Sequence, residues 1–189
     1  MRLNGRPDAI KSRLLVSHPA ALFAMTEASF IPAQILPYQA AALFTLATQY
    51  DKTGAVILDI GTAAGYSAAI LAQAAPRAHI ITLNSAGHEI NTAVRNLKRW
   101  RNIEIINVNA NDYLRHWPIG QKTEMIFIDG DHKQIWGDLG WWKHVNAGGL
   151  LLCHDYSPAS ASHPCPTVYD AVNEFARIII GRDPDILII

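Results

Sequence analysis

From Ala55 onward, short apolar runs alternate with segments in which apolar residues recur at helical spacing. The apolar runs are continuous rather than interrupted at every second position, which is typical of strands covered on both faces of a sheet. The expected strands are Val56–Ile60, His79–Asn84, Ile103–Val108, Met125–Asp129, Gly149–His154 and Ile186–Ile189. The expected helices are Ser67–Ala75, Glu89–Trp100, Asn111–His116, Gln134–Val145 and Val168–Ile180. Strands that alternate with helices predict a parallel sheet, because each parallel pair needs a long crossover connection.

The resulting architecture is an α/β fold, a doubly wound and mostly parallel sheet with helices on both faces. The length of 189 residues suits one such domain. Within residues 1–50, Ala20–Ala24 and Tyr38–Tyr50 have helical spacing, and we expect an N-terminal helical cap or lid there. Residues 51–189 are expected to form the single globular unit that binds a ligand. Ligands of such sheets bind beyond the carboxyl ends of the strands, so the residues that follow each strand are the candidates.

Composition and charge exclude several classes of protein. The formal net charge is zero and 17% of the residues are charged, so we expect no surface for nucleic acid or for an anionic membrane. No apolar run approaches the length needed to cross a bilayer. The two cysteines, Cys153 and Cys165, lack the spacing of a zinc site. We expect free thiols in a reducing cytoplasm, and a disulfide between them is the alternative.

The loop after the first strand, Asp59–Ser67, has the composition of a ligand-binding turn. Gly61 permits a tight strand-to-helix turn, and Gly65 lets a ligand approach the backbone closely. The helix that follows begins with N–H groups that bind anions, and Asp59 can accept a hydrogen bond from a ligand ammonium, directly or through water. The loop lacks the dinucleotide fingerprint, because Ala63 stands where that pattern needs glycine. A plain glycine turn is the alternative interpretation.

Ionisable side chains follow the fourth and fifth expected strands. Asp129 and His132 come after the fourth strand, and His154 and Asp155 come at the end of the fifth. If these strands are neighbours, their ends lie about 5 Å apart, and the two carboxylates can share one cation such as Mg²⁺, Ca²⁺ or Mn²⁺. A contribution from His154 would shift the preference toward softer metals. The alternative is that the aspartates only cap helices or stabilise turns.

The segment Asp59-Ile-Gly-Thr-Ala-Ala-Gly-Tyr-Ser67 resembles motif I of the class I S-adenosylmethionine-dependent methyltransferases, whose fold is Rossmann-like. Its ending, Gly65-Tyr66-Ser67, is similar to that of the small-molecule O-methyltransferases, which include the catechol and caffeoyl-CoA types. The resemblance implies that S-adenosylmethionine is the cofactor and that this loop holds its methionine part.

A second part of the chain resembles a bacterial group of small-molecule O-methyltransferases. It consists of Ile128-Asp-Gly-Asp-His132, followed by Gly148-Gly149 and His154-Asp155. The resemblance runs from about Val56 to about Phe175. It implies transfer of a methyl group to a hydroxyl oxygen of a small molecule.

The resemblance also implies which residues contact the cofactor. They are Asp59, Gly61, Thr62, Gly65, Tyr66, Ser67, Asn84, Asn109, Ala110 and Asp129. Asn84 departs from the family pattern, because that strand end usually carries an acid that binds both ribose hydroxyls. An amide at that position gives up a charge-assisted increment on the order of 1 kcal/mol. Asn109, at the turn expected to face the adenine, likewise stands where an acid is common.

In the metal-dependent relatives, the positions of Asp129, His154 and Asp155 bind the ion, so the resemblance implies Mg²⁺ or another divalent cation there. It also implies that His132 is the catalytic base and that Asp129 takes part in catalysis. The helix that carries Asp138, Leu139 and Trp142 is interpreted as packing.

Three other readings of the sequence remain open. The first is a metal-independent methyltransferase, in which His132 acts alone. The second is a non-catalytic S-adenosylmethionine-binding or regulatory protein, and the third is a nicotinamide-dependent oxidoreductase.

Methyltransferases of this type usually finish with a strand hairpin, whereas only Ile186–Ile189 is visible here, so the hairpin is expected to be incomplete. Either the chain is cut short, or a second copy completes the edge in a homodimer, since an open edge strand invites pairing.

Overall fold

In the computed structural model, which describes residues 19–85, 87–179 and 185–188, six strands form one open sheet. All neighbouring strands are parallel, in the order β3-β2-β1-β4-β5-β6. The strands are β1 (Val56–Ile60), β2 (His79–Asn84), β3 (Ile103–Asn107), β4 (Thr123–Ile128), β5 (Val145–Cys153) and β6 (Asp185–Ile188). The predicted doubly wound α/β class is therefore confirmed.

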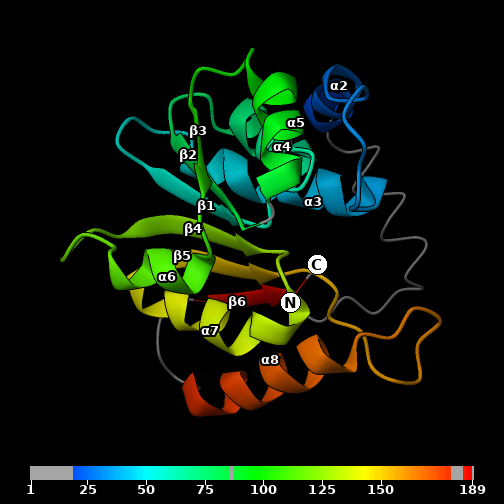
Figure 1. Cartoon of the computed structure of the whole chain (residues 1–189), viewed down its shortest axis with the longest axis vertical. Coiled ribbons are helices and arrows are strands. Elements are labelled where there is room, and N and C mark those ends of the chain that lie inside the picture. Colours follow the sequence, from blue (N-terminus) through cyan, green and yellow to red (C-terminus); the bar gives the residue numbers. More distant parts are fainter. Residues whose placement is uncertain (1–18, 86, 180–184, 189) are drawn as a thin grey trace.

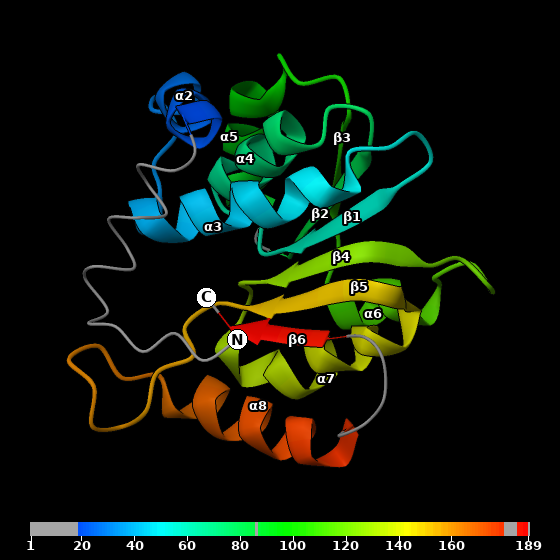
Figure 2. The same ribbon diagram turned by 180° about the vertical axis from the view of Figure 1, so that it is seen from behind.

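Helices cover both faces of the sheet (Figures 1 and 2). One face carries α2 (Pro19–Glu27), α3 (Pro37–Ala47), α4 (Tyr66–Ala74) and α5 (Gly87–Leu97). The other face carries α6 (Ala110–Arg115), α7 (Ile135–Leu139) and α8 (Pro166–Ile179). Short 3₁₀ turns are η1 (Thr48–Tyr50), η2 (His132–Gln134) and η3 (Gly140–His144). Within the described part of the chain, each helix is too short or too polar to traverse a bilayer.

Successive residues of a strand contribute to different cores, which explains the continuous apolar runs in the sequence. Ile57 and Phe127 pack with α2–α5, whereas their neighbours Leu58 and Ile126 pack with α6–α8. All four side chains are fully buried. Because side chains alternate between the two faces of a strand, a sheet covered on both faces has no polar side. The helices of the N-terminal segment, α2 and α3, pack in the same core as Ile57 and Phe127.

Two predicted elements were wrong. The helix expected over Gln134–Val145 is only α7, because 3₁₀ turns flank it and Val145 already begins β5. Its Gly137 lowers helix propensity, and a Cβ there would lie 2.1 Å from the Asn111 Oδ1 atom of α6. The fifth strand, expected to begin at Gly149, already begins at Val145, so the Gly148-Gly149 pair lies within β5, where the register against β4 shifts.

The strand order places the switch point between β1 and β4. The chain passes from β1 outward to β2 and β3, then returns to β4 on the other side of β1. The loops that leave β1 and β4 therefore start side by side and diverge, which opens space for a ligand above the strand ends. The expected terminal strand is β6, which pairs in parallel with β5. The last residue of that expectation, Ile189, lies outside the described residues, as do residues 1–18 of the expected cap.

Candidate active site

Gly61 brings the loop after β1 directly against the loop after β4. Its φ is +109°, and a Cβ built on it would lie 2.1 Å from the backbone oxygen of Asp129. The backbone N–H of Asp129 in turn donates to the Ile60 carbonyl at 2.8 Å. Further along the loop, Ala63 also has a left-handed φ, of 43°. Such strained positions persist only where the surroundings hold them, and they are common at ligand sites.

Asp59 is fully buried below this loop. Its Oδ2 atom accepts hydrogen bonds from Thr82 Oγ1 at 2.6 Å and from Ser67 Oγ at 3.2 Å. The second oxygen, Oδ1, is buried and has no hydrogen-bond partner among the described residues. The pKa of Asp59 is raised to about 7, chiefly by burial and slightly by the nearby charge of Asp129, although the hydrogen bonds from the two hydroxyl donors oppose the rise. A buried oxygen without a donor suits a ligand ammonium or a bridging water.

Two cavities lie on either side of Gly61 and share it as a common wall. The first has an empty volume of about 340 Å³ and the second about 250 Å³. Of the predicted cofactor residues, the first cavity is lined by Gly61, Asn84, Asn109 and Ala110, and the second by Gly61, Thr62, Tyr66, Ser67 and Asp129. Asp59 lies behind Ser67 and does not itself line either cavity. Gly65 also lines neither cavity, because it packs against the Leu97 side chain.

The two asparagines that depart from the family pattern, Asn84 and Asn109, both form hydrogen bonds with neighbouring residues. Asn84 Nδ2 donates to Glu89 Oε2 at 3.2 Å, so α5 brings a carboxylate beside the strand end that lacks one. Asn109 is the N-cap of α6, and its Oδ1 accepts from the Asn111 backbone N–H at 2.9 Å. Its Nδ2 donates to Gln134 at 2.7 Å. A cap needs a short polar side chain, which asparagine supplies. The pair of Asn84 with Glu89 was not predicted from the sequence.

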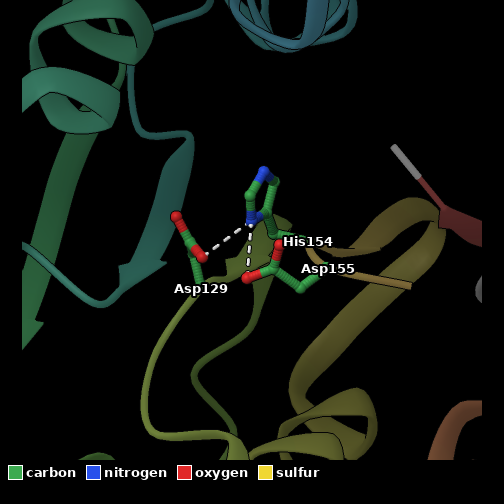
Figure 3. A group of neighbouring side chains, drawn as sticks. All are labelled: Asp129, His154 and Asp155. Atoms are coloured by element: carbon green, nitrogen blue, oxygen red, sulfur yellow. Dashed lines mark ion pairs between the residues drawn. The ribbon is translucent and has the colours of Figure 1, made fainter. Parts of the chain in front are cut away.

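Asp129, His154 and Asp155 form a compact cluster at the ends of β4 and β5. His154 Nδ1 lies 3.0 Å from Asp129 Oδ1 and 3.2 Å from Asp155 Oδ2, and Figure 3 shows the ring nitrogen directed between the two carboxylates. One ligand atom from each residue lies within 4.8 Å of the others. His154 is buried, and its Nε2 atom has no hydrogen-bond partner among the described residues. The structure thus brings Asp129 together with His154 and Asp155, which lie far from it in the sequence.

The charges in the cluster compensate one another. Burial lowers the pKa of His154, but the adjacent carboxylates of Asp129 and Asp155 outweigh burial and raise that pKa to about 9. The contact with His154 lowers the pKa of Asp155. Asp155 also has a left-handed φ of 55°, a conformation that aspartate adopts more readily than most other non-glycine residues. Two oxygen donors and one imidazole nitrogen around one point are a donor set that divalent cations bind.

His132 lies at the rim of this cluster, at the start of η2. Its Nε2 atom is 3.0 Å from Asp155 Oδ2, and its Nδ1 atom is 3.3 Å from Cys165 Sγ. A third cavity, lined by Asp129, His132, Asp138 and His154 among others, connects these groups. Cys165 and Cys153 both carry free thiols. The contact of His132 with Cys165 was not predicted, because Cys165 lies in a proline-flanked loop with no readable periodicity.

A family model described as a methyltransferase domain matches residues 58–156, which is more than half of the 189-residue chain. The match includes the loop after β1 and the acid–histidine cluster, which consists of Asp129, His154 and Asp155. No curated protein matches the chain.

Solved structures of methyltransferases share the fold. The O-methyltransferase TomG from Streptomyces achromogenes, in complex with S-adenosylmethionine, is 22% identical with a TM-score of 0.66, over 96% of this chain and 82% of TomG. An O-methyltransferase from Bacillus cereus, in complex with S-adenosylhomocysteine, is 22% identical with a TM-score of 0.65, over 94% and 81% of the two chains. The Podospora anserina methyltransferase PaMTH1, bound to S-adenosylhomocysteine, is 17% identical with a TM-score of 0.67, over 97% and 90%.

Proposed function

Because this chain belongs to the methyltransferase-domain family, we propose that it transfers the methyl group of S-adenosylmethionine to a hydroxyl oxygen of a small molecule. The proposal is supported by the structures of similar fold, among them an O-methyltransferase bound to S-adenosylmethionine and another bound to S-adenosylhomocysteine. It assigns the two cavities beside Gly61 to the cofactor, with its amino acid part near Ser67 and its nucleoside part near Asn84 and Asn109.

The observation that carries the proposal is the contact between the two loops at Gly61. It sets the cavity above Asp59 next to the cluster of Asp129, His154 and Asp155. A sulfonium held in the cavity would therefore lie beside groups that bind and deprotonate a hydroxyl. Holding the hydroxyl at near-attack distance from the methyl carbon accounts for roughly 7–11 kcal/mol of such a barrier. In this assignment His132, at the rim, takes the proton from the hydroxyl.

The proposal includes Mg²⁺ or another divalent cation, held by Asp129, His154 and Asp155. The convergence of the Asp129 and Asp155 carboxylates on the Nδ1 atom of His154 supports such a site. A bound cation acts as a Lewis acid that lowers the pKa of a hydroxyl ligand. The residues of the chain would orient the substrate beside it and exclude water.

The proposal also retains three broader expectations. Residues 1–50 act as a cap, which is supported by Pro32, Gln34 and Ile35 in the wall of the second cavity. The protein works in the cytoplasm, in line with its two free thiols, on a small molecule rather than a nucleic acid or a membrane. A homodimer would cover β6, which among the described strands pairs only with β5.

Calorimetric titration with S-adenosylhomocysteine and, separately, with NAD tests the proposed function. We expect S-adenosylhomocysteine to bind and to stabilise the fold by about 2.7 kcal/mol at one hundred times its Kd. NAD should give neither signal, because the loop after β1 lacks the dinucleotide pattern. Binding of NAD alone would contradict the proposal and favour an oxidoreductase. Binding of the adenosyl ligand without formation of S-adenosylhomocysteine from any hydroxyl compound would favour a regulatory protein.

His132→Ala is expected to lower methyl transfer about 100-fold, since a positioned general base contributes at least this much. The affinity for S-adenosylhomocysteine should stay within about threefold, because His132 lines neither cofactor cavity. Turnover and calorimetric affinity check the two parts separately. The matched control is His116→Ala, an exposed histidine outside the three cavities. Equal losses of turnover and affinity, or no loss of either, would argue against the assigned role.

Removal of divalent cations with a chelator is expected to reduce turnover at least tenfold, because the hydroxyl would lose its Lewis acid. Added Mg²⁺ or Mn²⁺ should restore it. Asp129→Asn should lower the affinity for Mn²⁺, measured by electron paramagnetic resonance in the absence of substrate. Asp112→Asn, on exposed α6, is the control. Full activity after exhaustive chelation would show that His132 acts without a metal.

A further inference from the structure

Asp138, on α7, occupies a position between the cofactor cavity and the acid–histidine cluster. It lines both the first cavity, with Asn109 and Ala110, and the third cavity, with Asp129 and His154. Only 3% of its surface is exposed. The sequence interpretation of the helix that carries this side chain was packing. A carboxyl group that opens onto two cavities does not fit that interpretation.

The carboxyl group of Asp138 has no hydrogen-bond donor among the residues that the structure describes. In the same cavity, by contrast, the side chains of Asn109 and Gln134 form a hydrogen bond with each other. Burial, and after it the nearby charge of Asp131, raise the pKa of Asp138 to about 7. A buried carboxyl without a partner is costly to the fold. Such a group therefore indicates a partner that arrives with a ligand.

The first cavity has the walls expected for a flat heterocycle. Ile60, Leu83 and Val108 supply apolar surface, and Asp138 lies beside Gly130. A Cβ on Gly130 would lie 3.5 Å from Asp138 Oδ2. Apolar walls with a few convergent polar groups are typical of sites that orient a small ligand.

We propose that Asp138 binds the base of the nucleoside ligand. Its carboxyl group pairs with the edge of the base on which an amino group, a donor, lies next to a ring nitrogen, an acceptor. The chemical class is an aminopurine, and the inference rests on the proposed function, in which the cofactor is an adenosyl compound. A carboxylic acid offers a carbonyl acceptor and a hydroxyl donor side by side, which matches that edge with two hydrogen bonds. Asp138 is not part of the proposed cation site, because the ligand atoms that converge there belong to Asp129, His154 and Asp155.

Two variants separate base recognition from packing. Asp138→Asn keeps one acceptor and one donor in the same shape, so it should bind S-adenosylhomocysteine within about threefold of wild type. Asp138→Leu keeps the volume but removes both hydrogen-bonding groups, so it should bind the same ligand at least tenfold more weakly. Thermal unfolding of the ligand-free proteins checks the fold. Neither variant should be destabilised, since each removes a buried ionisable group.

The analogue of S-adenosylhomocysteine in which hydrogen replaces the exocyclic amine provides the decisive comparison. Wild type and Asp138→Asn should prefer the amino compound by about tenfold, whereas Asp138→Leu should bind the two compounds almost equally. Asp112→Leu, the same substitution on the surface of α6, should keep the preference of the wild type.

The outcomes distinguish this assignment from the proposed function. If wild type binds S-adenosylhomocysteine and Asp138→Leu binds it as tightly, the assignment of Asp138 is wrong while the proposed function stands. A leucine variant that is weakened equally for both compounds also overturns the assignment, because Asp138 would then contact another part of the ligand. If wild type binds neither compound, the proposed function and the assignment both fail.

Discussion

Asp59→Asn is expected to make the ligand-free protein more stable at pH 8, by up to about 4 kcal/mol, and to leave its stability at pH 4 nearly unchanged. The wild-type carboxyl titrates at about 7 in the folded protein, against 3.8 for an ordinary aspartate, chiefly because it is fully buried. Each unit of such a shift corresponds to about 1.4 kcal/mol.

The sign follows from which state ionises first. Between pH 4 and pH 7 the unfolded chain gains a carboxylate while folded Asp59 stays protonated, so rising pH favours unfolding. Above pH 7 both states are ionised and the penalty is constant. Asparagine does not titrate, so the difference in unfolding free energy between the variant and the wild type should grow over this window. Urea denaturation at pH 4, 6 and 8 measures it.

The same variant should bind S-adenosylhomocysteine at least tenfold more weakly at pH 8, because an amide cannot form a charge-assisted hydrogen bond with an ammonium. Asp170→Asn removes an exposed carboxyl on α8 and is the control for both measurements. A stability difference that does not change with pH would mean that Asp59 is ionised in the folded protein throughout. Unchanged affinity would mean that Asp59 does not serve the ligand.

Gly61→Ala is expected to destabilise the protein by about 2–5 kcal/mol and to abolish cofactor binding. The left-handed φ of +109° costs an alanine about 1–2 kcal/mol. The overlap of its Cβ with the Asp129 carbonyl, only 2.1 Å away, must be relieved by separating the loops after β1 and β4. Overpacking of this kind typically costs 1–3 kcal/mol more, and the separation would displace the walls of both cavities.

Gly54→Ala provides the matched comparison. Gly54 also has a positive φ, of +85°, but no heavy atom lies within 4 Å of a Cβ built there. The Gly54→Ala variant should therefore lose only about 1–2 kcal/mol of stability, the cost of the left-handed φ, and should bind S-adenosylhomocysteine normally. Equal losses of stability in the two variants, measured by urea denaturation, would show that the loops after β1 and β4 can separate without cost. The contact at Gly61 would then not organise the site.

Local patterns in the sequence were sufficient for the strands. The expected ends of β1 and β2 agree with the structure, those of β3 and β4 and the start of β6 differ from it by one or two residues, and β5 begins four residues earlier than expected. A continuous apolar run reports that both faces of a segment are buried, and this property needs no knowledge of the partner. The same reasoning located Asp59, Asp129 and His154, since polar residues at the end of a buried run lie at the edge of the sheet.

Only the tertiary structure decided which of these residues meet. The pairing of Ile128 with Cys153 sets Asp129 level with His154, and nothing in either segment alone fixes that register. The breaks around α7, the pair of Asn84 with Glu89 and the contact of His132 with Cys165 were likewise not predicted. Periodicity records whether a position is buried but not what it is buried against. The sequence by itself therefore determined the fold class and the candidate residues, whereas packing between distant segments decided their distances, their burial and the exposure of Asp138 to two cavities.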